Sequence, residues 1–155
     1  MGNRNHELST GEFYHVYNRG VDKRVIYQDQ ADYKRFLNLL FLCNTNKAIN
    51  VRDVKHAHAN IYDFERKDNL VAIGAYCLMP NHFHLLVAPV VEDGLSVFLR
   101  KVATSYSMYF NKKHHRTGSL FEGRFKSEHV DSDTYLKYLF SYIHLNPVKL
   151  IQPDW

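Results

Sequence analysis

The chain has 155 residues, of which 45% are hydrophobic and 14% aromatic, so it can bury one sizeable core without help from disulfides. Its cysteines, Cys43 and Cys77, are both flanked by apolar residues, which argues against a disulfide framework or a zinc knuckle. The first ten residues are polar and no apolar run is long enough to span a membrane, so we expect a cytoplasmic protein with no membrane partner. The formal net charge of +4 favours an acidic partner, with nucleic acid the leading candidate.

The first half of the chain predicts a strand, a helix and a long polar segment. We expect residues 1–10 to form a flexible leader and residues 11–155 a single domain. Residues 13–19 are aromatic and β-branched between two glycines, which predicts a strand. Apolar residues at helical spacing predict a helix over 30–43. The asparagine-rich stretch 44–69 is weakly periodic, and we predict an excursion with a short strand near 60–64.

The second half of the chain predicts a hairpin followed by a helix, a strand and a last helix. The apolar run LVAIGAYCL at 70–78 predicts a central strand, joined by a tight connection at 79–81 to a partner strand over 82–87. A helix is expected from Gly94 to about Tyr109, then a basic loop over 111–118, a strand over 124–130 and a helix over 134–145. This order predicts an α+β, ferredoxin-like split βαβ fold with an antiparallel sheet and helices on one face. The C-terminal helix is free to lie against the sheet.

Two histidines lie two residues apart in the strand-like segment MPNHFHLLV at 79–87. Successive side chains of a strand point to opposite faces, so His82 and His84 share one face. Paired imidazoles in an apolar setting are well placed to bind a divalent metal ion. For an arbitrary pair of this kind, half-exposed histidines satisfied by hydrogen bonds are the more common outcome.

The last helix offers a tyrosine and an amide that could complete a site. Tyr142 and Asn146 are four residues apart and share one helical face. Asn146 could lend its amide oxygen to a metal ion, and Tyr142 could aim its hydroxyl at a phosphodiester bound there. The alternative is that Tyr142 is one more aromatic residue at the edge of the core.

Basic and aromatic residues alternate between residues 100 and 126, a combination suited to single-stranded nucleic acid or hairpin ends. The cations are Arg100, Lys101, Lys112, Lys113, Arg116, Arg124 and Lys126. We favour phosphate contacts for the run 112–116 and for Arg124, while the alternative is a solvated basic loop. Arg19, with Asn18, ends the first strand and is equally explained as a structural anchor or a phosphate-binding residue.

Several segments together resemble the single-tyrosine HUH transposases of the insertion-sequence-200-like type, and most closely the REP-associated tyrosine transposases. They are YHVYNRG at 14–20, YCLMPNHFHLLV at 76–87, YSMYFN at 106–111, GSLFEGRF at 118–125 and YIHLNPVK at 142–149. The resemblance implies that His82 and His84 are the metal ligands, that Asn146 completes the metal site and that Tyr142 is the catalytic tyrosine.

The reaction that the resemblance implies is transesterification on single-stranded DNA with Mg²⁺ or Mn²⁺. Tyr142 would form a 5′-phosphotyrosine link and free a 3′-hydroxyl that can later reverse the step. The expected partner is DNA carrying hairpins or palindromic repeats in a bacterial-type cytosol, and a second copy of the chain is a candidate partner. Two alternatives stay open: a non-catalytic protein that binds single-stranded or hairpin nucleic acid, and a metal-dependent phosphodiesterase that uses water.

Overall fold

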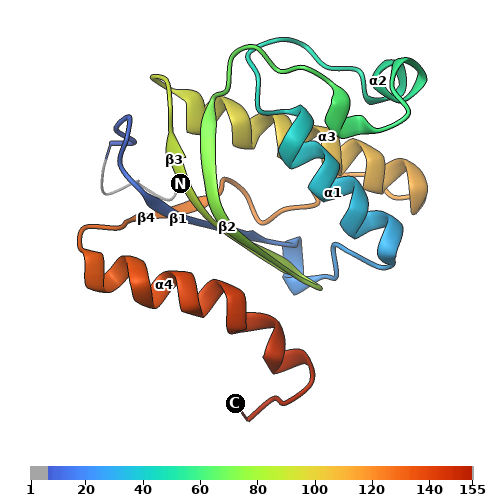
Figure 1. Cartoon of the computed structure of the whole chain (residues 1–155). Coiled ribbons are helices and arrows are strands. Elements are labelled where there is room, and N and C mark those ends of the chain that lie inside the picture. The colour runs from blue at the N-terminus through green and yellow to red at the C-terminus, as the bar shows by residue number, and fades with distance from the viewer. Residues whose placement is uncertain (1–6, 155) are drawn as a thin grey trace.

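A four-stranded antiparallel sheet with the strand order β2-β3-β1-β4 forms the centre of the computed structural model, which describes residues 7–154 (Figure 1). The strands are β1 Tyr14–Arg19, β2 Val71–Met79, β3 His82–Pro89 and β4 Lys126–His129. The helices are α1 Gln30–Leu42, α2 Val51–Ala57, α3 Gly94–Lys113 and α4 Asp133–Leu145, and short 3-10 turns occur at Val21–Lys23, Ile61–Asp63 and Asn146–Leu150. Element order and strand order confirm the predicted ferredoxin-like plan.

Helices cover both faces of the sheet, and the alternation of side chains along β3 shows how. Phe83 and Leu85 lie in the main core, to which α1 and α3 contribute Phe36 and Phe98. Leu86 points the other way and packs in a second core with residues of α4. α1 and α3 therefore share one face, as predicted, and α4 lies against the opposite face (Figure 1).

The β2–β3 hairpin forms at the predicted position, with Met79 opposite His82 and the turn at Pro80 and Asn81. The segment that follows β1 is bonded to this turn, because Gly20 N–H donates to Asn81 O and Ile26 N–H to Pro80 O. A Cβ atom on Gly20 would lie 2.4 Å from the Arg24 carbonyl oxygen, so only glycine allows this approach. The end of β1 is thereby held beside the first histidine of β3.

The segment 44–69 contains helical turns, and the strand predicted near residues 60–64 is wrong. α2 and the 3-10 turn Ile61–Asp63 occupy this region. Asparagine side chains start both, since Asn50 Oδ1 accepts from Arg52 N–H and Asn60 Oδ1 from Tyr62 N–H. These local caps outweigh the β propensity of the isoleucine and tyrosine that follow.

Two further boundaries differ from prediction. α3 continues to Lys113, into the segment expected to be a basic loop, and lysines in a last helical turn are favoured by the helix dipole. β4 spans only Lys126–His129 and is shorter than the strand expected over 124–130. Most of the expected leader lies outside the described residues, while Glu7 and Ser9 are hydrogen-bonded to Tyr14.

Candidate active site and nucleic-acid interface

The histidines of β3 lie on the face of the sheet that α4 covers, with ring centroids 5.0 Å apart. His84 is 7% exposed, and its Nε2 atom is buried with no hydrogen-bond partner within residues 7–154. Desolvation lowers the pKa of His82, and desolvation together with the neighbouring histidines and Lys149 lowers the pKa of His84 to about 3. Both imidazoles are therefore neutral near pH 7 and can offer a lone pair to a cation.

The Nδ1 atom of each histidine has a close partner, which orients the ring. His82 Nδ1 lies 2.6 Å from Asn81 Oδ1 in the hairpin turn, and His84 Nδ1 lies 2.9 Å from His15 Nε2 on β1. The β1–β3 register explains the second contact, since Tyr17 pairs with His84 and places His15 diagonally across from it. Both rings are thus held with Nδ1 engaged.

α4 brings a tyrosine to these rings. The helix begins at a cap in which Ser132 Oγ accepts from Tyr135 N–H, and it buries Leu139 and Ile143 against the sheet. Tyr142 lies beside Ile143 on the helix, and its ring stands edge-on to the ring of His84, with ring centroids 5.5 Å apart. Phe140, in the same helix, is 48% exposed.

Asn146 and Lys149 come after Tyr142 in the sequence and also lie close to it in the structure. Asn146 is buried directly after α4, and its backbone N–H donates to Tyr142 O. Lys149 Nζ lies 5.6 Å from the centroid of the Tyr142 ring. The site thus combines paired imidazoles, a tyrosine hydroxyl, a buried amide residue and a cation.

The side chains of this site suit a metal ion that takes part of its ligands from outside the protein. Within the described part of the chain, no three His, Cys, Asp or Glu side chains are grouped to hold a metal ion. A cation at His84 would need the neutral imidazoles, the Asn146 amide oxygen and oxygens from elsewhere, such as a substrate phosphate. The buried and unpartnered Nε2 atom of His84 fits this role, because such an atom is costly unless something binds it.

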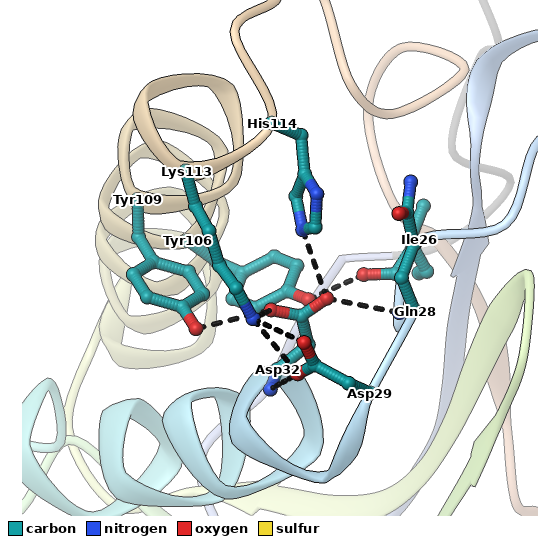
Figure 2. A network of polar contacts seen from close by, with 8 residues as sticks. All are labelled: Ile26, Gln28, Asp29, Asp32, Tyr106, Tyr109, Lys113 and His114. Carbon is teal, nitrogen blue, oxygen red and sulfur yellow. Dashed lines mark hydrogen bonds and ion pairs between the residues drawn. The ribbon is translucent and has the colours of Figure 1, made fainter.

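Several cations expected to contact DNA have partners within the protein. Lys113 Nζ lies 2.6 Å from Asp29 and 2.8 Å from Asp32, which ties the end of α3 to the start of α1 (Figure 2). Arg19 forms an ion pair with Glu122, and Lys101 donates to the carbonyls of Thr45 and Lys47. Arg116 is bonded to Asn111 and to Ser119 O, and the Asn18 amide donates to Gly123 O.

The remaining cations are exposed and form no ion pair with residues 7–154. They are Arg100, Lys112, Arg124 and Lys126. Arg100 and Arg124 line a cavity of about 530 Å³ together with Phe83, Phe121 and Phe125. Lys126 lines a smaller cavity of about 320 Å³ that also contains His82, Arg19 and Lys23. The structure thus places cations beside the histidines and around a second, aromatic cavity on another side of the sheet.

Sequence reasoning missed four residues of this site: His15, Tyr17, Glu128 and Lys149. His15 and Tyr17 are two residues apart in the first strand, so the sequence placed them on one face of the sheet. Only the pairing of that strand with β3 shows that this is the face of His84. Glu128 lies opposite His15 on β4.

The sheet, the paired histidines and the facing tyrosine define a ferredoxin-like domain with a histidine–tyrosine site. A family model described as "Transposase IS200 like" matches residues 33–146. The chain therefore belongs to the IS200-like transposase family, which makes it a DNA-cleaving and DNA-joining type of protein. This confirms the family named from the sequence motifs.

One solved structure shares this fold. The chain is similar to a REP-associated tyrosine transposase solved with a REP hairpin, with a TM-score of 0.62 and 16% identity over 96% of this chain and 74% of that chain. It is also similar to a candidate transposase from Deinococcus radiodurans, with a TM-score of 0.45 and 16% identity over 93% of this chain and 96% of that chain. No curated protein matches the chain. Within residues 7–154, no helix combines the length and apolar character needed to span a membrane.

Proposed function

We propose that this protein is a single-tyrosine transposase that nicks and rejoins single-stranded DNA at hairpins or palindromic repeats. The observation that carries the proposal is the position of Tyr142, whose ring centroid lies 5.5 Å from that of His84. The buried Nε2 atom of His84 has no hydrogen-bond partner among the described residues. A tyrosine hydroxyl is a weak nucleophile until a metal ion or a base assists it.

In the proposed reaction the Tyr142 hydroxyl oxygen attacks the phosphorus of a DNA phosphodiester. A bond forms between these two atoms, the bond from phosphorus to the 3′ oxygen breaks, and a proton passes to that oxygen as the tyrosyl proton is lost. The product is a 5′-phosphotyrosine link and a free 3′-hydroxyl. Because the link is itself a phosphodiester, a 3′-hydroxyl can reverse the step without an external energy source.

His82, His84 and Asn146 are the residues that would hold a divalent cation, Mg²⁺ or Mn²⁺. Such a cation supplies Lewis-acid polarisation of the scissile phosphate when bound. Asn81 and His15 orient the two imidazoles, and burial keeps both neutral. The Lys149 ammonium group would stabilise the negative charge that develops beside Tyr142.

DNA binding is proposed for the exposed cations. Arg100 and Arg124 would contact phosphates beside the aromatic cavity, and Lys112 and Lys126 would extend the contact. The similar REP-associated transposase was solved with a hairpin, which supports a hairpin as the partner of this chain. The ring of Tyr142 contacts that of His84 in the same chain, so this contact needs no second copy of the protein. A homodimer therefore stays a prediction.

The decisive test compares Tyr142→Phe with Tyr138→Phe, a matched control one turn earlier on α4 whose side chain is 62% exposed. Each variant is incubated with Mn²⁺ and a single-stranded oligonucleotide that carries a palindromic hairpin from the DNA flanking the gene. Covalent protein–DNA adducts on denaturing gels should vanish with Tyr142→Phe and persist with Tyr138→Phe. Adducts that survive in Tyr142→Phe contradict the proposal.

The other outcomes identify the alternatives. Cleavage that survives Tyr142→Phe but not His82→Ala or His84→Ala indicates a phosphodiesterase that uses water. Metal-independent binding without cleavage of any strand indicates a non-catalytic binding protein. Mixing Tyr142→Phe with His84→Ala tests for a shared site, because activity recovered by the mixture requires residues from two chains.

A further inference from the structure

A third histidine lies behind the proposed ligand. His15 is 7% exposed on β1, and its ring lies nearly parallel to that of His84, with ring centroids 5.1 Å apart and an interplanar angle of 23°. Its Nε2 atom is 2.9 Å from His84 Nδ1. This distance requires a proton between the two nitrogens, so one ring donates and the other accepts.

A carboxylate stands on the far side of His15. Glu128, directly opposite His15 in the β1–β4 ladder, places Oε2 3.9 Å from His15 Nδ1. Two tyrosine hydroxyls hold this carboxylate, since Tyr17 donates to Oε1 over 3.1 Å and Tyr135 donates to Oε2 over 3.0 Å. The negative charge at this position favours a proton on His15 Nδ1.

The position of that proton decides the direction of the next hydrogen bond. A neutral His15 that is protonated on Nδ1 has a lone pair on Nε2 and accepts from His84 Nδ1–H. His84 then has its own lone pair on Nε2, the buried atom that has no partner within residues 7–154. Partners of this kind behind a metal-binding histidine select its tautomer and fix its ring.

We propose that His15 is a positioning residue, supported by Glu128, which holds His84 in the Nδ1-protonated tautomer and so presents its Nε2 lone pair to the cation. This role rests on the proposed function, because that function places a cation at His84. The site thus extends from α4 across β3 and β1 to β4.

The test uses three full-length variants. His15→Leu removes the acceptor, His15→Gln keeps an amide oxygen that can accept from His84 Nδ1–H, and His56→Leu is a control at an exposed histidine of α2. The tautomer of His84 is read from the ¹⁵N chemical shifts of its ring in metal-free protein. The affinity for Mn²⁺ alone is measured by calorimetry, and circular dichroism verifies folding.

Wild type, His15→Gln and His56→Leu should show the Nδ1-protonated form of His84. His15→Leu should shift it towards the other tautomer and weaken Mn²⁺ binding by about 10–100-fold. An Nε2-protonated His84 in wild type, or a wild-type tautomer and Mn²⁺ affinity in His15→Leu, overturns the role of His15. If His15→Leu does not fold, a His15→Gln variant that has lost the Nδ1-protonated form overturns it as well.

The proposed function fails by different results. Absence of Mn²⁺ binding in wild type overturns the metal site and this role together. Adducts that persist in Tyr142→Phe overturn the tyrosine chemistry and leave the ¹⁵N result unchanged.

Discussion

Replacing Asp32 by alanine should remove the anchor between α1 and α3. Its side chain is fully buried at the start of α1 and accepts four hydrogen bonds (Figure 2). The donors are Gln28 N–H at 2.9 Å, Tyr109 Oη at 3.0 Å, Lys113 Nζ at 2.8 Å and His114 Nε2 at 3.1 Å. Removing the acceptor leaves its buried donors unsatisfied, which costs about 1–3 kcal/mol for such a group. Because Lys113 is partly exposed and keeps its contact with Asp29, we expect Asp32→Ala to lower the free energy of unfolding by about 3 kcal/mol.

Urea denaturation followed by circular dichroism measures this loss, provided that the m-value is unchanged. Asp29→Ala is the control, since its side chain is half exposed and it leaves the four hydrogen bonds of Asp32 in place. Its loss should be clearly smaller. A loss of less than about 1 kcal/mol in Asp32→Ala, the level of a surface ion pair, would show that Asp32 does not anchor α1 to α3.

The same carboxylate predicts how stability changes with pH. Burial raises the pKa of Asp32, but the hydrogen bonds from Lys113, Gln28, Tyr109 and His114 outweigh it and hold the pKa below its ordinary value. A group whose pKa is depressed by folding stabilises the protein above its unfolded pKa of about 3.9, and this stability is lost as the pH falls through the folded pKa. The difference in stability between wild type and Asp32→Ala should therefore shrink below about pH 4.

Three further outcomes are expected. Arg100→Ala and Arg124→Ala should each weaken single-stranded DNA binding, measured by fluorescence anisotropy, and reduce the slope of log K against log salt concentration by about 0.7–1. The thermal midpoints should stay unchanged, and an unchanged slope contradicts phosphate contact. Ile143→Ala should cost about 2–5 kcal/mol in urea denaturation, because the side chain is fully buried between α4 and the sheet, and a loss under about 1 kcal/mol would mean that α4 is not packed there. Burial raises the pKa of Cys77 to about 11, so its thiol should react with a disulfide reagent at pH 8 only after unfolding, and rapid reaction of the native protein would contradict its burial.

Local sequence was enough to predict the sheet residues of the site. The alternation in the segment 79–87 placed His82 and His84 on one face, and the hairpin turn at Pro80 and Asn81 followed from residue type. The one-turn spacing of Tyr142 and Asn146 was equally visible, because an α-helix repeats over short distances.

The partners of the cations were not visible. In the sequence, Lys113 and Arg19 look as suitable for phosphate contact as Arg100 and Arg124. In the structure, however, Lys113 forms an ion pair with Asp29, and Arg19 forms one with Glu122. These partners are far away in sequence and adjacent only after α1 packs on α3 and β1 meets the segment before β4. No periodic pattern carries that information.

Sequence alone thus determined the element order, the shared face of the two histidines and the tyrosine on the last helix, because each depends on backbone periodicity over a few residues. Strand pairing and helix packing place α4 on the histidine face of the sheet and bring His15 and Glu128 behind His84, and they leave some of the predicted cations exposed without an ion pair within residues 7–154. Those features depend on strand register and helix packing, where a shift of one residue would turn every side chain to the other face.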